Sequence, residues 1–216
     1  MDYFNYKFSN ALYSKVKKDR KLSRMFWSSN VGKCSELFDN FFRDKDYDFT
    51  KEDWVRYYFD NADKNVLNAI ADFIVDNYNC SLLEAKQYVF HRVLGQTWNG
   101  MVKEMEVIEE INLELPNISF VKTTHDIDEN YFTDWEAYSN NNLLFGIQIK
   151  PISYKKMSNP FQLKSKEHHD KQRILYKERF NVPHIIIYYE DNSLYDKDYV
   201  LNQINTILSM KINVIF

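Results

Sequence analysis

Hydrophobic and polar residues alternate with a period of two in two neighbouring stretches near the middle of the chain, 131–138 and 143–150. In the second stretch one face is entirely apolar, formed by Leu143, Phe145, Ile147 and Ile149. Such alternation places successive side chains on opposite faces of a strand. Asparagine-rich segments such as 139–142 are typical of tight turns. The pattern therefore predicts a β-hairpin.

The register of this hairpin decides whether its polar side chains meet. A three-residue loop, 140–142, places Asp134 opposite Gln148, and residues opposite each other share a face. Lys150 then lies on that face as well. A four-residue loop instead puts Asp134 opposite Ile147 and separates the polar groups. The chemical interpretation needs the odd loop, or a bulge that restores its parity.

Carboxylates on a partly buried sheet face indicate a cation site. Asp134 and Glu136 share a face, and two carboxylates repel each other by roughly 4 kcal/mol at ~4 Å with an effective dielectric of 20. A bound cation converts that repulsion into binding. The alternative is an ordinary sheet whose polar face is wet.

Spacing of apolar residues and capping signals predict the other elements. Helices are expected over 63–78, 81–93, 97–115, 161–180 and 196–210. The glycines of the segment 95–100 are expected to separate two helices. Short strands are expected at 118–121 and 183–189, and residues 125–130 are expected to form a polar turn. The fold class is α+β: a mainly helical region (1–94) and a core with a mixed central sheet flanked by helices (95–216).

The distribution of charge is more informative than the net charge of −3. Residues 104–136 hold ten acids and one base, whereas 151–181 hold eight bases and three acids. An acidic cluster beside a basic one is what a metal site next to a row of phosphate contacts requires, although such segregation is also common by chance on solvated helices. Candidate phosphate contacts are the basic residues near the N-terminus and after the hairpin, namely Lys17, Lys18, Arg20, Lys21, Lys155, Lys156, Lys164, Lys166 and Arg173.

The remaining composition sets limits on the class of protein. Two cysteines, Cys34 and Cys80, are too few for a zinc motif or a disulfide framework. The chain has no signal peptide and no run of 18 apolar residues, so we expect a cytoplasmic protein without a membrane partner. Only 4 of the 216 residues are glycine, and such a chain is expected to use glycine where the backbone comes close to another group.

Three short motifs resemble a known nuclease family. They are GQTWNGM at 95–101, DWEAY at 134–138 and GIQIKP at 146–151. The order of elements and the acid followed by Gln-x-Lys resemble the PD-(D/E)XK nuclease superfamily, with Gln148 in place of the usual second acid. The three motifs together resemble, more narrowly, MjaI-type type II restriction endonucleases. The resemblance covers roughly residues 95–190.

The resemblance implies a role for each site residue. Asp134 matches the metal-binding acid, Gln148 the second ligand and Lys150 the motif lysine. Ile149 would offer its carbonyl oxygen to the metal. Glu104 matches the helix glutamate found in many members, with Glu109 as an alternative, and Glu136 or Glu104 would compensate for the neutral Gln148.

The implied activity is cleavage of double-stranded DNA at a short palindromic site, with CTAG as the family's suggestion. The implied cofactor is Mg²⁺, for which Mn²⁺ can substitute, and the products carry a 5′-phosphate and a 3′-hydroxyl. A palindrome implies a homodimer, and a restriction role implies a cognate DNA methyltransferase encoded nearby. Alternatives are another DNA nuclease of this superfamily (a resolvase, repair or nicking enzyme) and a non-catalytic nucleic-acid-binding protein.

Overall fold

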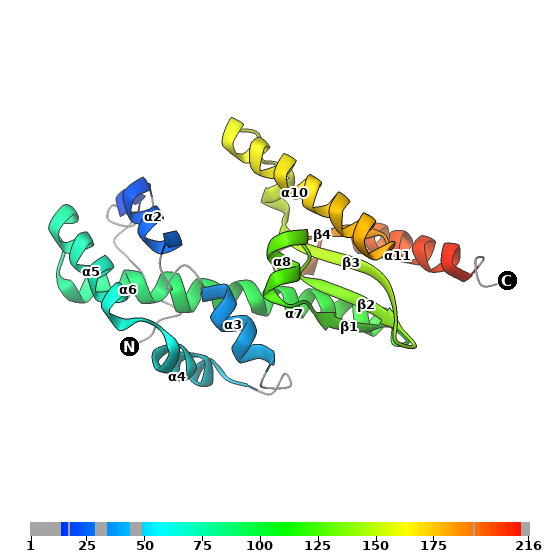
Figure 1. Cartoon of the computed structure of the whole chain (residues 1–216), viewed down its shortest axis with the longest axis horizontal. Coiled ribbons are helices and arrows are strands. Elements are labelled where there is room, and N and C mark those ends of the chain that lie inside the picture. The colour runs from blue at the N-terminus through cyan, green and yellow to red at the C-terminus, as the bar shows by residue number, and fades with distance from the viewer. Residues whose placement is uncertain (1–13, 17, 29–33, 44–48, 192, 213–216) are drawn as a thin grey trace. The chain divides into compact units, whose positions relative to one another are not determined.

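The computed structural model describes residues 14–16, 18–28, 34–43, 49–191 and 193–212 (Figure 1). The candidate phosphate contact Lys17 lies outside the described residues. The chain divides into two compact units, Met1–Met101 and Val102–Phe216. Within the described ranges, no helix is both long enough and apolar enough to cross a membrane.

The first unit consists of helices packed around aromatic side chains. Its helices are α2 (Arg20–Ser28), α3 (Cys34–Arg43), α4 (Lys51–Asn61), α5 (Lys64–Tyr78) and α6 (Leu82–Phe90). The capping box predicted for α6 is present, since Ser81 and Glu84 each accept a hydrogen bond from the other's backbone N–H. Trp54 is fully buried, and its ring centroid lies 4.7 Å from that of Phe38 and 5.6 Å from that of Phe41.

The expected break at the glycines of segment 95–100 is wrong. Helix α6 continues through a π-helical turn, η1 (His91–Gly95), directly into α7 (Gln96–Glu114). Gly100 has a helical backbone, and a methyl group added to it would meet nothing within 4 Å. Helical hydrogen bonding therefore overrides the weak helix propensity of these glycines, which costs about 1 kcal/mol each relative to alanine.

The second unit is built on a five-stranded sheet in which the strands lie in sequence order. The strands are β1 (Ser119–Lys122), β2 (Trp135–Ser139), β3 (Asn142–Pro151), β4 (His184–Glu190) and β5 (Ser193–Leu194). β3 and β4 are parallel, and the other neighbours are antiparallel. This mixed sheet with flanking helices confirms the predicted α+β class (Figure 1).

The central hairpin reaches the required register through a bulge. Its loop has two residues, Asn140 and Asn141, both with left-handed backbone (φ 48° and 63°), as a tight hairpin turn needs. Ala137 pairs with Phe145 and Tyr138 with Leu143, so Leu144 is an extra residue in β3. This extra residue shifts the pairing beyond it by one position, which gives the same register as the three-residue loop considered from the sequence.

Helices flank the sheet, and the first two of them along the chain were not expected from the sequence. They are α8 (His125–Tyr131), α9 (Ile152–Lys155), α10 (Pro160–Phe180) and α11 (Lys197–Ile212). The polar turn expected at 125–130 is in fact helix α8, capped by the Thr124 side chain, which accepts a hydrogen bond from Ile127 N–H. β2 consequently begins at Trp135 rather than at residue 131. α11 is tied to α7 by Lys197, whose ammonium lies 2.7 Å from Glu114.

Helix α10 is anchored on the sheet through a glycine in β3. A methyl group added to Gly146 would lie 2.6 Å from the ring of the fully buried Tyr176. The hydroxyl of Tyr176 donates a 2.7 Å hydrogen bond to Glu136. The absence of a side chain at Gly146 thus allows Tyr176 to lie against the strand, which confirms the expected use of glycine at this position.

We predict that Gly146→Ala and Gly100→Ala change stability in opposite directions. The first substitution displaces buried Tyr176 and is expected to lower the free energy of unfolding by about 1–3 kcal/mol. The second adds a methyl group in open space on a helix and is expected to raise stability by about 0.5–1 kcal/mol. Guanidinium unfolding followed by circular dichroism measures both. A Gly146→Ala protein as stable as the wild type would contradict the packing described.

Candidate active site

The Asp134 carboxylate is held at the start of the hairpin by its neighbours on β3. It is 3% exposed. One of its oxygens, Oδ2, accepts hydrogen bonds from the Gln148 side-chain amide (2.5 Å) and from the Ile149 backbone N–H (2.8 Å). Trp135, the first residue of β2, pairs with Ile147, and the hydrogen bonds of Asp134 with Gln148 and Ile149 place its carboxylate on the Gln148 side of β3. The register that the sequence requires for a cation site is therefore present.

Gln148 carries the most unusual polar atom of the site. Its side chain is fully buried, and its amide nitrogen is used by Asp134. Among the described residues, its other polar atom, Oε1, has no hydrogen-bond partner. A buried, unsatisfied acceptor costs about 1–3 kcal/mol. Such an atom beside a carboxylate is an oxygen suited to bind a cation.

Electrostatics favour the ionised form of Asp134. Burial alone pushes its pKa upward, but the positive charges of Lys150 and Lys122 and the hydrogen bond from Ile149 outweigh it. The pKa of Asp134 therefore lies below its usual value. Asp134 carries a full negative charge at neutral pH.

Lys150 lies on the same face of β3 as Gln148, two residues along the strand. Its register partner on β4 is Tyr188. The Lys150 ammonium lies 4.9 Å from the ring centroid of Phe132, at the end of α8. The His169 ring stacks on the same Phe132 ring, with ring centroids 3.9 Å apart. The aromatic contact holds the ammonium at the same end of the hairpin as Asp134.

Glu104 on α7 is paired with a lysine that sequence reasoning missed. The Lys122 ammonium at the end of β1 lies 2.9 Å from the Glu104 carboxylate. Burial and the negative charge of Asp134 nevertheless raise the pKa of Glu104 to about 7. Glu109, the alternative helix acid, is exposed. The interaction with Asp134 thus favours Glu104 for that role.

Asp128 is a third carboxylate of this cluster that sequence reasoning also missed. It lies on α8, and burial and the charge of Asp134 raise its pKa to about 8. Its proximity depends on α8 being a helix rather than a turn. The available signal was Thr124, a good N-cap residue directly before a polar segment.

Glu136 is occupied by other partners. Its two carboxylate oxygens accept hydrogen bonds from the hydroxyls of Tyr138 and Tyr176, each 2.7 Å long. It lies two residues beyond Asp134 along the hairpin, opposite Gly146 rather than Gln148. The structure does not bring Glu136 into contact with Asp134 or Gln148 among the interactions of the described residues.

A buried histidine connects α10 to the segment before Asp134. His184 is 3% exposed, and burial together with the nearby charge of Arg173 lowers its pKa to about 3, so the ring is neutral. Its Nδ1 accepts a 3.1 Å hydrogen bond from Arg173 Nε. Its Nε2 lies 2.9 Å from the Phe132 carbonyl and 3.1 Å from the Thr133 hydroxyl. His184 thus supports the residues that lead into the site.

The candidate phosphate contacts are distributed over both units. In the first unit, the side chains of Lys18, Arg20 and Lys21 are exposed at the start of α2. In the second unit, Lys155, Lys156 and Lys164 are exposed, and Lys166 and Arg173 are partly buried. Lys166 donates a 3.1 Å hydrogen bond to the Lys155 carbonyl. These lysines of α9 and α10 lie near one another.

The residues present fit a magnesium ion that keeps most of its water. Among the described residues, no three carboxylate, histidine or cysteine side chains are grouped closely enough to hold a metal. Mg²⁺, however, commonly takes only one or two carboxylates and retains several waters. The Asp134 carboxylate and the unsatisfied Oε1 of Gln148 provide that kind of oxygen set.

Comparison with known proteins identifies the family. The family model described as MjaI restriction endonuclease matches residues 22–206. Comparisons with curated proteins and with solved structures returned no match. Because the matched region covers most of the chain, the protein belongs to the MjaI restriction endonuclease family. It is thus a nuclease whose substrate is DNA. The match also includes residues 22–94, a stretch in which no motif was recognised.

We predict that Asp128→Asn stabilises the protein most at alkaline pH. The folded pKa of Asp128 is raised, so ionisation penalises the folded state increasingly as pH rises from about 4 toward 8. Removing the carboxylate should therefore raise the melting temperature at pH 8 and raise it less at pH 5. The exposed Asp126 of the same helix serves as the control through Asp126→Asn. Equal melting shifts for the two variants at both pH values would contradict the burial of Asp128.

Proposed function

We propose that the protein cleaves both strands of DNA in a Mg²⁺-dependent reaction at the site around Asp134. The observation that carries the proposal is the unsatisfied, fully buried Oε1 of Gln148 beside an ionised carboxylate. Buried polar atoms in native proteins are nearly always hydrogen-bonded, so an unsatisfied one indicates a missing partner such as an ion. A cation that binds both Asp134 and Gln148 satisfies it.

The metal ligands would be the Asp134 carboxylate, the Gln148 amide oxygen and the Ile149 carbonyl. When bound, Mg²⁺ supplies a Lewis acid that offsets negative charge on the scissile phosphate. The Ile149 N–H holds the carboxylate in place through its 2.8 Å hydrogen bond. Mn²⁺ has the same preference for oxygen ligands and should substitute.

Lys150 would act directly on the attacking water and on the scissile phosphate. Its ammonium orients the attacking water and neutralises the charge that develops on the phosphate. Attack in line with the leaving oxygen then gives a 5′-phosphate and a 3′-hydroxyl. Glu104 and Asp128, whose pKa values are raised to about 7 and 8, hold protons near neutral pH and release them when positive charge enters the site.

The substrate is proposed to be a short palindromic duplex, with CTAG as the first sequence to test. Two copies of the chain related by a two-fold axis would read such a site and cut one strand each. The exposed lysines of α9 and α10 would contact the backbone, because Lys155, Lys156 and Lys164 extend from the same unit as Asp134. A cognate DNA methyltransferase encoded nearby would protect the host.

We predict that Asp134→Asn and Lys150→Ala abolish cleavage but not DNA binding. Loss of the charged ligand should slow cleavage by at least about a thousandfold, and loss of the ammonium by about a hundred- to a thousandfold. Plasmid digestion with excess Mg²⁺ and sequencing of the ends measure both. Gel-shift assays in Ca²⁺ measure binding.

Asp126→Asn is the control for this experiment, since Asp126 is exposed on α8. It should cleave like the wild type. DNA cleavage by the wild-type protein that continues in excess EDTA would contradict the proposed metal dependence. Retardation of DNA without any shortening, in Mg²⁺ and in Mn²⁺, would support the non-catalytic alternative. Nicked plasmid as the sole product would support a nicking role, and cleavage of branched DNA without cleavage of the plasmid would support a resolvase role.

We predict that Gln148→Glu makes stability depend on Mg²⁺. The introduced carboxylate replaces the hydrogen bond to Asp134 with repulsion, so the metal-free variant should melt at a lower temperature than the wild type. An additional ligand charge strengthens binding, so Mg²⁺ should raise the melting temperature of this variant more than that of the wild type. Gln96→Glu, at an exposed position, adds the same charge elsewhere. An equal Mg²⁺ response in all three proteins would contradict metal binding at Gln148.

A further inference from the structure

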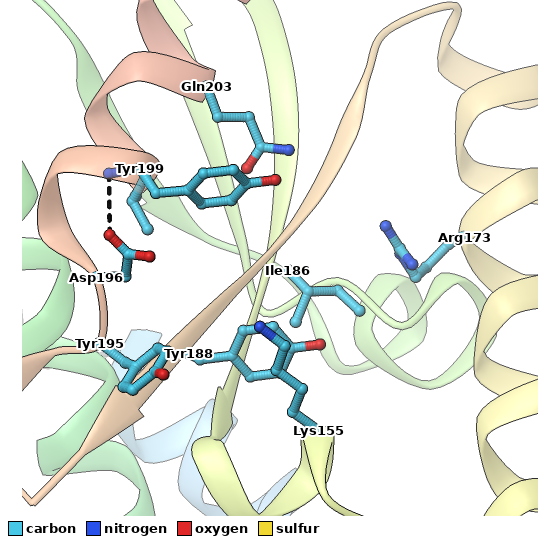
Figure 2. Close-up of a pocket in the computed structure, with 9 residues that line it drawn as sticks. Lys155, Arg173, Ile186, Tyr188, Tyr195, Asp196, Tyr199 and Gln203 are labelled. Carbon is cyan, nitrogen blue, oxygen red and sulfur yellow. Dashed lines mark hydrogen bonds between the residues drawn. The ribbon is translucent and has the colours of Figure 1, made fainter.

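A pocket of about 460 Å³ opens beside β4, on the part of the sheet next to the candidate active site (Figure 2). Its lining comes from β4, α9, α10, α11 and the two residues between β5 and α11, so it is formed entirely within the second unit. A volume of this size is typical of small-molecule sites. Neither the proposed metal ligands nor Lys150 line it.

The pocket lies one strand away from the proposed catalytic residues. Ile186 and Tyr188, which line it, are the register partners of Gln148 and Lys150 on the parallel neighbour β3. Register partners share a face of the sheet, and neighbouring strands are about 4.8 Å apart. A ligand that contacts Tyr188 therefore lies about one strand spacing from the β3 backbone at Lys150.

Three tyrosines supply aromatic surface to the pocket. Tyr195 and Tyr199 are 39% and 63% exposed, and Tyr188 is half-buried. In Figure 2 the ring of Tyr199 extends from α11 into the space between that helix and α10. Aromatic rings with accessible faces are the surfaces on which unpaired bases stack.

Two cations flank these rings. The Lys155 ammonium lies 5.7 Å from the ring centroid of Tyr188 and 5.8 Å from that of Tyr195. Arg173, across the pocket on α10, is fixed by hydrogen bonds to His184 and Asp170, each 3.1 Å long. A fixed guanidinium is an efficient phosphate contact because little conformational freedom is lost on binding.

The opposite side of the pocket offers groups suited to the edge of a base. Asp196 and Gln203 lie on the α11 side together with Tyr199 (Figure 2). One Asp196 oxygen accepts a 3.4 Å hydrogen bond from the Tyr199 N–H. A carboxylate accepts hydrogen bonds from exocyclic amino groups of bases, and a glutamine amide both donates and accepts. The pocket thus has a basic side and a side that carries hydrogen-bonding groups.

We propose that this pocket binds one unpaired nucleotide of the DNA strand, next to the phosphate that is cut. The base stacks on Tyr199 and Tyr195, its edge meets Gln203, and its phosphate contacts Lys155 and Arg173. A base within a duplex is covered on both faces by its neighbours, so only a nucleotide taken out of the stack can enter. The proposal rests on the proposed function, because it places the pocket beside the cleavage site.

The test uses a single-stranded decamer of thymidine with one central 2-aminopurine, at low salt and without divalent cations. Stacking on a tyrosine quenches the fluorescence of this base, so wild-type protein should give a saturable decrease. Tyr199→Ala should weaken the interaction by about tenfold or more, whereas Tyr199→Phe should retain it. Lys155→Gln should weaken binding and reduce its salt dependence. Phe161→Ala, which removes an exposed aromatic side chain outside the pocket lining, should change nothing.

Two results would overturn the proposal: no quenching by the wild-type protein, or equal quenching by Tyr199→Ala and the wild type. Asp134→Asn separates this outcome from failure of the cleavage reaction, because that variant retains the pocket and should quench normally. Absence of Mg²⁺-dependent cleavage in the wild type, with quenching that depends on Tyr199, would reject the proposed function and leave a nucleotide-binding pocket.

Discussion

One inserted residue in β3 determines whether the site can exist. The asparagine turn by itself would pair Asp134 with Ile147, because a two-residue loop gives even parity. The bulge at Leu144 moves every later residue by one position, so that Asp134 meets Gln148 and the Ile149 N–H. Side chains alternate between faces, so without this shift the carboxylate would face the apolar side of β3.

The cluster of charged side chains around Asp134 is the second constraint on the structure of the site. Three carboxylates, Glu104, Asp128 and Asp134, interact with two ammonium groups, Lys122 and Lys150. The hydrogen bonds and lysines favour ionisation of Asp134 above the others, and the raised pKa values of the remaining two acids limit the negative charge near neutral pH. The site is thus close to electrically balanced when it holds no cation, which lets a partly buried acid cluster persist in a folded protein.

Local sequence patterns were sufficient for the hairpin and for the helices α5, α10 and α11, and they made the convergence of Asp134 with Gln148 conditional on the hairpin register. They left the loop length open, and the structure resolved it through a bulge that no alternation pattern can reveal. α8 was missed because its seven residues are mostly polar, so no apolar periodicity marks them. Asp128 and His184 were missed for a different reason. Their importance depends on contacts between segments distant in sequence, and composition carries no record of such contacts.

The two attachments of α10 have a mechanical consequence. Tyr176 joins the helix to Glu136 on β2, and Arg173 joins it to His184 on β4, three residues earlier along the same helix. Both contacts hold α10 against the sheet that carries Lys150. If the lysines of α10 contact the DNA backbone, these buried contacts fix the distance along the DNA between the contacted phosphates and the phosphate that is cut. Adjustment to different DNA sequences must then occur elsewhere in the chain or in a second copy.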